Sequence, residues 1–294
     1  MNAFNNPYVQ IHLAVLLWGF TAILGDLISL SAFVLVWWRV GLTALLLMLF
    51  FGVRKEISKL PLFIVRYFSI AGLLLGLHWL CFYGAIKLSN ASVALVGFST
   101  MSFFTAFIEP LMSAKRVRNM DIFLGIAIMP GLFIVVKGLG NHHILGLAMA
   151  VLSAILLAVF AVLNKRRIDD TSPLMITFLE MSSAWVMLSV LFPVFLYFTV
   201  DEPVLLLEHN DIVYMTLLCI GCTIFPFFLQ LSSLKKISAF SANLAFNMEP
   251  IYGILLAAII LKDYNELSYQ FYVGSALIVA LVVIEPLLKK VYGH

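Results

Sequence analysis

The sequence has few charged residues and no long polar stretch. Only 11% of its 294 residues are Asp, Glu, Lys or Arg, whereas soluble domains contain about 25%. Hydrophobic residues make up 63%, and the mean hydropathy is +1.07. This composition excludes a soluble globular fold and a nucleic-acid-binding surface, and it predicts an integral membrane protein.

Cysteine is also scarce, and the motifs of cofactor chemistry are missing. The three cysteines, Cys81, Cys219 and Cys222, all lie within apolar segments. The CxxC spacing of the last two could indicate redox or metal chemistry. Because no His or further Cys lies near it, we favour small apolar filler. The sequence also lacks a GxxxxGK[ST] loop, which argues against direct use of ATP. We therefore expect no cofactor and no metal site.

Polar breaks divide the chain into ten apolar segments. They span roughly 8–28, 31–52, 66–87, 90–113, 119–137, 143–164, 173–199, 211–234, 238–261 and 268–288. A helix needs about 20 residues, at about 1.5 Å each, to cross a hydrocarbon core of about 30 Å. We therefore predict an all-α membrane protein with ten transmembrane helices. The N-terminal stretch has no Lys or Arg, so we expect the first helix to be retained rather than cleaved.

The basic residues alternate between the loops. Fourteen of the 18 Lys and Arg fall on one side of the predicted bundle. They are Arg54, Lys55, Lys59, Arg66, Lys115, Arg116, Arg118, Lys165, Arg166, Arg167, Lys235, Lys236, Lys289 and Lys290. Lys87, Lys137 and Lys262 fall on the other side, and Arg39 alone lies inside a segment. Positive loops face the cytoplasm, so we predict both termini inside and the acidic loop around 201–211 outside.

The chain also divides into two similar halves, 1–140 and 141–294, with five apolar segments each. At an offset of 149 residues, Lys87, Ser89, Ser92, Leu95 and Gly125 align with Lys236, Ser238, Ser241, Leu244 and Gly274. At an offset of 141, Arg39 aligns with Glu180. Because five is odd, the second half enters the membrane from the opposite side. Inverted repeats are typical of secondary transporters, whose site lies near the midplane.

Several stretches resemble a known family. They are LLWGFTAIL (16–24), Arg39, SANLAFNMEPIYGILLAAIILKD (241–263) and YVGSALIV (272–279). They resemble the ten-helix, EamA-type branch of the drug/metabolite transporter superfamily, over nearly the whole chain. The resemblance implies a permease of the bacterial inner membrane, often an exporter of amino acids or other small metabolites, that works by alternating access. It also implies that helices one, three, four, six, eight and nine surround a cavity.

The two halves depart from each other within this pattern. Met101 stands where the second half has Pro250, and Ala114 stands where it has Asp263. A strictly symmetric mechanism is therefore not expected.

Polar side chains near the middle of the segments are the candidate substrate-binding residues. These are Trp18, His78, Ser99, Thr100, Asn243, Asn247 and Glu249. A charge at the bilayer centre costs from about 2.5 to over 10 kcal/mol, so Glu249 needs a partner or a water-filled cavity. Pro250 cannot donate a hydrogen bond to the Phe246 carbonyl. The freed carbonyl beside Asn247 and Glu249 predicts a substrate or proton site.

Each candidate also has a structural alternative. Glu249 could be a protonated acid that is hydrogen-bonded between helices. The hydroxyls of Ser99 and Thr100 and the ring of His78 could bond one helix to another. Trp18 could simply pack. The sequence does not decide between these alternatives.

Arg39 and Glu180 form a separate pair of candidates. The repeat places them at similar depths with opposite charge, which allows an intramembrane ion pair if their helices adjoin. Alternatively, Arg39 could snorkel outward, face Asp26 or bind an anionic substrate group. We favour pairing or snorkelling.

The leading hypothesis is a secondary transporter, most simply an exporter of small metabolites. It would be driven by protons or by the substrate's own gradient, and its partners would be a small-molecule substrate and the lipid bilayer. A channel or passive facilitator is the main alternative. An intramembrane enzyme is less favoured because His78 is the only His well inside a segment.

Overall fold

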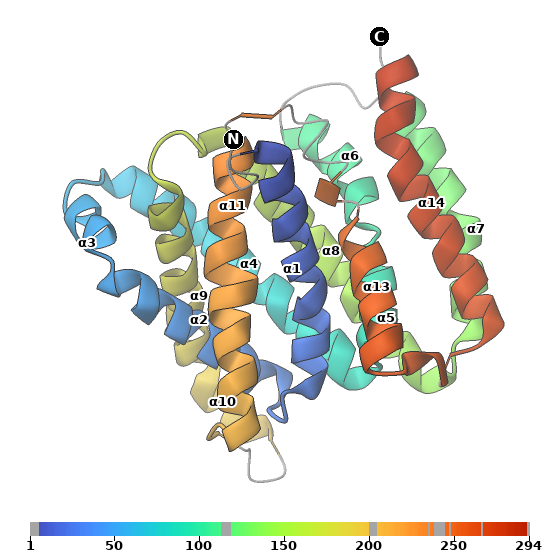
Figure 1. The fold of residues 1–294 in the computed structure, drawn as a ribbon, viewed down its shortest axis with the longest axis horizontal. Helices are drawn as coiled ribbons and strands as arrows, with labels where there is room; N and C mark the ends of the chain where they lie inside the picture. Colours follow the sequence, from blue (N-terminus) through green and yellow to red (C-terminus); the bar gives the residue numbers. More distant parts are fainter. Residues whose placement is uncertain are drawn as a thin grey trace.

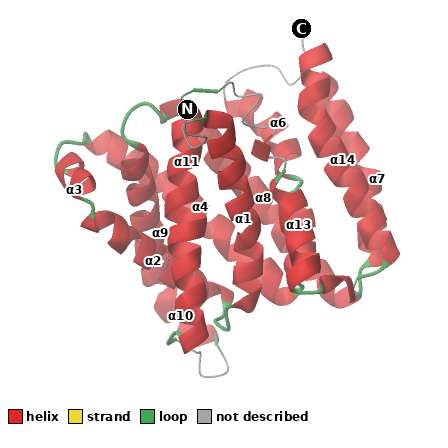
Figure 2. Cartoon of the chain, viewed as in Figure 1, coloured by secondary structure: helices red, strands yellow, loops and turns green. Residues whose placement is uncertain are grey.

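The computed structural model describes residues 6–112, 119–199, 205–234, 236–237, 245–246, 248–265 and 267–292. Within these residues the chain forms helices joined by loops, with no strand (Figure 2). The helices are α1 (Pro7–Leu27), α2 (Ala32–Leu49), α3 (Phe51–Ile57), α4 (Leu62–Leu88), α5 (Ala91–Phe98), α6 (Met101–Met112), α7 (Asn119–Gly138), α8 (Asn141–Arg167), α9 (Pro173–Phe198), α10 (His209–Thr216), the π-helix η2 (Leu217–Ile224), α11 (Phe225–Leu234), α13 (Glu249–Ile260), the 3-10 helix η3 (Asp263–Asn265) and α14 (Tyr269–Tyr292).

Local sequence signals start several of these helices. The side chains of Asn6, Ser31, Asn90 and Ser172 each accept a hydrogen bond from a backbone N–H of the first turn. Such N-caps satisfy donors that have no partner within the helix. In α9, Pro173 follows the cap at the first helical position, where its missing N–H costs nothing. The polar breaks of the sequence are therefore physical helix starts.

The described residues contain seven helices that are long and apolar enough to cross a membrane. These are Pro7–Leu27, Ala32–Leu49, Leu62–Leu88, Ala91–Met112, Asn141–Arg167, Pro173–Phe198 and His209–Ser233. Three shorter apolar helices, Ile126–Gly138, Glu249–Ile260 and Tyr269–Leu281, lie in the remaining predicted segments. The chain is a multi-pass membrane protein.

The helix ends gather at two ends of the bundle. Figure 1 shows the start of α1 and the end of α14 at one end, with the start of α10 at the other. We name the latter the acidic end, after Asp26, Asp211 and Asp263. There, the Ser29 backbone N–H and hydroxyl donate to the Asp211 carboxylate, the former at 3.0 Å. The Ser268 hydroxyl donates to the Gly138 carbonyl at 2.6 Å, joining α14 to α7.

The opposite end is the basic end, named after Arg54, Lys165 and Arg167. Lys165 on α8 pairs with Glu109 on α6 at 2.7 Å, with both side chains exposed. The same sorting of acidic and basic loops was expected from the sequence, so the charge pattern follows the two ends of the folded bundle.

Glu56 attaches the short helix α3 to the start of α9. Its carboxylate accepts hydrogen bonds from the hydroxyls of Thr171 and Ser172 and, at 3.0 Å, from the backbone N–H of Ser172. Desolvation by burial acts to raise the pKa of this carboxyl, but the hydrogen bonds from Ser172 and Thr171 outweigh it, and the pKa lies below its ordinary value. The contact therefore favours an ionised Glu56.

Equivalent helices of the two halves pack against each other in opposite directions. On α7 and α14, a Cβ added to Gly138 would lie 2.6 Å from the backbone nitrogen of Phe271, and one added to Gly131 would lie 2.8 Å from Ile278. As the residue number falls on α7, that of its neighbour on α14 rises, so the two helices are antiparallel. Glycine lets their backbones approach closely, as is common between membrane helices.

The pair α2 and α9 shows the same arrangement. The Trp37 indole donates to the Ser189 hydroxyl at 2.9 Å, and the rings of Phe33 and Phe195 stack with centroids 4.4 Å apart. The helices α5 and α13 also contact each other. Antiparallel packing of equivalent helices is the arrangement that an inverted repeat produces.

The remaining contacts form two matching groups. Helix α8 packs against α4, α5 and α6, whereas α1 packs against α11, η2 and α13. We call these the α8 group and the α1 group. Exchanging the two halves of the chain converts one group into the other, and the main hydrophobic cluster draws residues from both groups.

Candidate functional site

Arg39 is a deeply buried charged residue, with 1% of its surface exposed. Its Nε and Nη2 donate to the Thr223 hydroxyl at 3.1 and 2.9 Å, and its Nη1 donates to the Tyr83 hydroxyl at 2.7 Å. Nη2 also lies 3.4 Å from the Cys222 carbonyl oxygen. The guanidinium carbon stands 3.7 Å from the centre of the Trp79 ring, a favourable cation–π contact. The side chain thus joins α2 to α4 and η2.

A proline explains why a backbone carbonyl of η2 can accept a hydrogen bond from Arg39. Pro226 has no backbone N–H, so it cannot donate to the Cys222 carbonyl four residues earlier, and its ring crowds that carbonyl. The chain winds as a π-helix over Leu217–Ile224, and the Thr223 hydroxyl donates to the Leu218 carbonyl at 2.8 Å. π-Helical turns are frequent at functional sites. Here the turn leaves the Cys222 carbonyl available to Arg39.

The two cysteines of the CxxC motif pack within this region as free thiols. Both are buried, and the Cys219 sulfur lies 3.6 Å from the Arg39 carbonyl oxygen.

Glu180 has a different partner from the one that the repeat allowed. Its carboxylate accepts a hydrogen bond from the Asn164 amide at 2.7 Å, and 1% of the residue is exposed. Although α2 and α9 adjoin, the described residues form no ion pair between Arg39 and Glu180. The side chains leave their helices on faces turned toward different neighbours, Arg39 toward α4 and η2 and Glu180 toward α8. The possible intramembrane ion pair is therefore corrected to two separate polar contacts.

His78 lies in an interhelical contact, one of the two alternatives that the sequence left open. Its Nδ1 is 2.7 Å from the Ser153 hydroxyl and 3.0 Å from the Ser153 carbonyl oxygen. The ring is 5% exposed and is flanked by the rings of Phe82 and Phe98, with centroids 6.1 and 5.8 Å away. In this structure His78 joins α4 to α8.

Ser99 and Thr100 occupy the break between α5 and α6. Their hydroxyls donate to the carbonyls of Val96 and Gly97 at 2.6 and 2.7 Å, and each residue is 3% exposed. The hydroxyls therefore satisfy backbone groups at the end of α5 rather than bonding to another helix. Their oxygens keep the capacity to accept a hydrogen bond.

Trp18 and Glu249 belong to the α1 group. The Trp18 ring contacts the rings of Phe227 and Phe246, with centroids 5.8 and 6.1 Å away. Glu249 is half-buried at the first position of α13. The candidates Asn243 and Asn247 lie outside the described residues.

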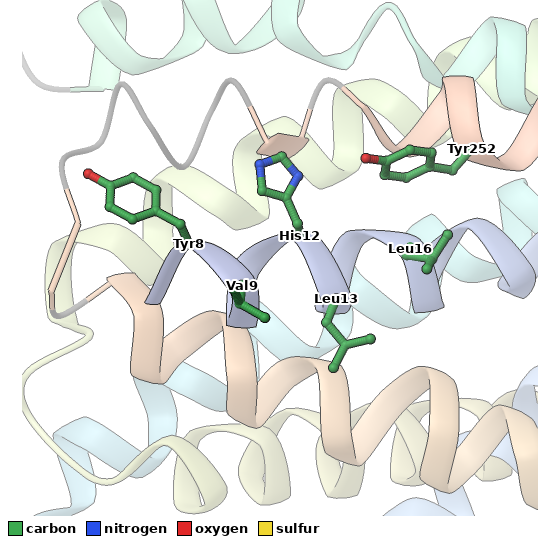
Figure 3. Close-up of a pocket in the computed structure, with 6 residues that line it drawn as sticks. All are labelled: Tyr8, Val9, His12, Leu13, Leu16 and Tyr252. Carbon is green, nitrogen blue, oxygen red and sulfur yellow. The ribbon is translucent and has the colours of Figure 1, made fainter. Parts of the chain in front are cut away.

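A cavity of about 450 Å³ lies beside the basic-end half of α1. It is lined by Tyr8, Val9, His12, Leu13, Leu16 and Tyr252. Figure 3 shows the His12 ring between the rings of Tyr8 and Tyr252. None of the candidate site residues lines this cavity, but Tyr252 follows Glu249 by three residues on α13, so the two side chains lie on similar faces of that helix.

The fold defines a class of protein: a multi-pass helical membrane protein built from two repeats whose equivalent helices pack antiparallel. The model of the EamA-like transporter family matches residues 6–137 and 144–284, and the chain belongs to that family. This confirms the resemblance found in the sequence. The chain is a membrane transporter of small solutes, and members of the family are transporters rather than enzymes.

A solved crystal structure whose title gives only "protein" shares this fold. It is 15% identical to the chain with a TM-score of 0.64, and the match covers 99% of each chain. No curated protein matches the sequence.

The sequence interpretation missed three partners of Arg39, namely Trp79, Tyr83 and Thr223. One signal could have pointed to them. A proline four residues after Cys222 frees a carbonyl within an apolar segment, and a buried arginine requires such acceptors. Only the fold shows that the two lie together.

Proposed function

We propose that the chain is a secondary transporter that exports small metabolites such as amino acids across the bacterial inner membrane. Ten transmembrane helices would form two inverted five-helix repeats, residues 1–140 and 141–294. The basic end, with both termini, would face the cytoplasm, because positive loops are retained on that side. Protons are the candidate coupling ions.

The observation that carries this proposal is the antiparallel packing of α2 with α9 and of α7 with α14. Inverted repeats allow one group of helices to rock against the other about a site at the midplane. The α8 group and the α1 group are two such units, related by exchange of the halves. Alternating access then results if the α8 group and the α1 group pack together in two arrangements, each of which opens one end of the bundle.

Within this mechanism, Glu249 is the proposed proton carrier and lies between the two ends of the bundle. Trp18, in the predicted segment 8–28, is proposed to contact the substrate. So are Asn243 and Asn247, which lie in the same predicted segment as Glu249, 238–261. His78, Ser99 and Thr100 on α4 and α5 are proposed to face the cavity when the two groups separate. An acid at mid-depth that is exposed in turn to either side can carry a proton.

The test uses purified protein in proteoliposomes. A thermal-shift screen of amino acids, purines and vitamins identifies a substrate, whose flux is then measured with and without a pH gradient. We expect Glu249→Gln to abolish gradient-driven accumulation but to retain counterflow exchange, since the carrier still binds substrate without its proton. The control is Glu208→Gln, the same change at the exposed start of α10, which should transport normally.

Two outcomes would contradict the proposal. If Glu249→Gln still concentrates substrate with an unchanged pH response, Glu249 is not the proton carrier. Single-channel currents, or flux without counterflow, would indicate the alternative function of a channel or passive facilitator.

A further inference from the structure

The two groups of helices are joined at the acidic end. Tyr83 of the α8 group packs so tightly on Gly25 of the α1 group that a Cβ added to Gly25 would overlap the Tyr83 ring. One turn further along α4, the Lys87 ammonium donates to the carbonyls of Asp26 and Ile28. These contacts close the bundle between α1 and α4.

Among the residues that the structure describes, the pair of helices equivalent to α1 and α4 makes less contact. Exchange of the halves converts the pair α1 and α4 into the pair α8 and α11. Within the described residues, α1 and α4 pack against each other, whereas α8 and α11 have no comparable contact. The contacts of Tyr83 and Lys87 with α1 close the acidic end.

Arg39, the eighth residue of α2, links the two groups on the inner side of this closed end. Its guanidinium bonds to Tyr83 in the α8 group and to Thr223 and Cys222 in the α1 group, so it connects the two units that the transport cycle would separate. Separating them breaks at least one side of this network. Rigid packing of either group alone does not require these bonds.

The chemistry of the network is suited to reversible opening. All the hydrogen-bond partners of Arg39 are neutral, so no ion pair within the described chain has to be broken. A buried guanidinium without these partners would be costly. When the acidic end opens, water can accept hydrogen bonds from Arg39 in place of the lost acceptors. Water can also donate a hydrogen bond to the Cys222 carbonyl. Closed and open states can then differ little in free energy, as a two-state element requires.

We propose that Arg39, Tyr83 and Thr223 form the latch that holds the acidic end closed, and that the π-helix η2 supplies hydrogen-bond acceptors for Arg39. Opening of this end requires Arg39 to release Thr223 and the Cys222 carbonyl while η2 moves away from α4. This inference rests on the proposed function, since only an alternating-access cycle requires the acidic end to open.

The native Cys222 is the reporter for the test. It is 4% exposed and lies beside the latch. In a background with Cys81→Ser and Cys219→Ser, a membrane-impermeant thiol reagent is added to intact cells and, separately, to inverted membrane vesicles. A cysteine at the exposed Glu208 position, Glu208→Cys, identifies which preparation presents the acidic end.

Thr223→Val keeps the shape of the side chain but removes the hydroxyl that accepts two N–H groups of Arg39. We expect Cys222 to react at least about tenfold faster from the acidic end, because the loss of hydrogen bonds to a charged group shifts such an equilibrium by about that factor or more. Tyr83→Phe removes the acceptor on the other group and should act in the same direction. Reaction from the basic end should not increase.

The matched control is Thr216→Val on the adjacent helix α10. Its hydroxyl also bonds to its own helix, donating to the Ile212 carbonyl at 2.7 Å, but it is exposed and does not contact Arg39. The control should label at the unmodified rate. If Thr216→Val accelerates labelling as much as Thr223→Val, or if neither latch variant accelerates it, the latch is overturned. Labelling requires no substrate, so a failure of transport alone contradicts the proposed function and not the latch.

Discussion

Arg39 and Glu180 occupy equivalent positions in the two repeats, yet their surroundings have diverged. Arg39 connects three helices through neutral hydroxyls, a carbonyl and an aromatic face. Glu180 has a single side-chain bond to Asn164, and its backbone belongs to a tight helix contact. A Cβ added to Gly72 on α4 would overlap the Glu180 carbonyl and lie 2.6 Å from its Cα atom.

The difference shows how an inverted repeat can make one helix interface, α4 with α9, rigid and the equivalent interface, η2 with α2, reversible. Near Glu180, Gly72 of α4 lies against the Glu180 backbone of α9, and Gly76 lies against Ala184 and Met187. This van der Waals contact is lost as soon as the helices part. Near Arg39, α2 and η2 are joined by polar bonds that water can replace. The first arrangement favours a static interface and the second a switch.

The largest effect is expected from adding a methyl group to the rigid interface between α4 and α9. Gly72→Ala inserts a methyl group against the Ser183 hydroxyl and the backbone of Glu180 and should destabilise the protein by about 3 kcal/mol. Thermal unfolding of purified protein in detergent measures the change. The control is Gly221→Ala in η2, where nothing lies within 4 Å of the added Cβ and no comparable loss is expected. Equal losses of stability in the two variants would contradict the distinction between a rigid α4–α9 interface and a reversible α2–η2 interface.

Conservative changes at the two equivalent positions should have unequal effects. Arg39→Lys replaces a planar fork with a single ammonium group, which cannot reach Thr223, Tyr83 and the Cys222 carbonyl together. We expect a loss of about 2 kcal/mol from the bonds to a charged donor. Glu180→Gln keeps an oxygen that can accept from Asn164, so the loss should stay below about 1 kcal/mol.

Chemical denaturation of both variants in the same detergent makes this comparison. A larger loss in Glu180→Gln than in Arg39→Lys would contradict the assignment of the denser polar network to Arg39.

The smallest effect is expected at Glu56, at the edge of the basic end. Its pKa is lowered in the folded state, so its ionised form adds stability above the ordinary carboxyl pKa of about 4.3, and this contribution is lost as pH falls through the lowered value. Glu56→Gln should therefore cost about 0.5 kcal/mol at neutral pH, a small value because the group is largely solvated.

The measurement is the stability difference between unmodified protein and Glu56→Gln across the acidic pH range. The difference should shrink as the solution is acidified. A difference that grows below the ordinary carboxyl pKa would show that the sign of this interaction is wrong.

The helix starts and the sorting of charge between the two ends could be predicted from the sequence. Caps such as Ser31 and Ser172 act within one turn, and loop charges such as Lys165 act through their position along the chain. The partners of Arg39 could not be predicted in this way. Trp37 and Arg39 are two residues apart on one helix, yet the first contacts Ser189 on α9 and the second contacts Thr223 on η2.

The candidate site shows the same limit. The sequence identified His78 and Glu180 as polar groups at depth and left their roles open. Their bonds to Ser153 and Asn164 on α8 depend on which helices adjoin and on how each is rotated. Residue spacing gives depth in the membrane, at about 1.5 Å per residue, but it does not give the neighbour across an interface.

The sequence by itself determined the membrane class, the apolar segments, the sorting of basic loops and the duplication into two halves, because hydropathy and charge act residue by residue along the chain. Only the tertiary structure decided that Arg39 bonds to Tyr83 and Thr223 rather than to Glu180. Each residue turns the helix by about 100°, so helix packing, and not sequence position, determines which side chains meet.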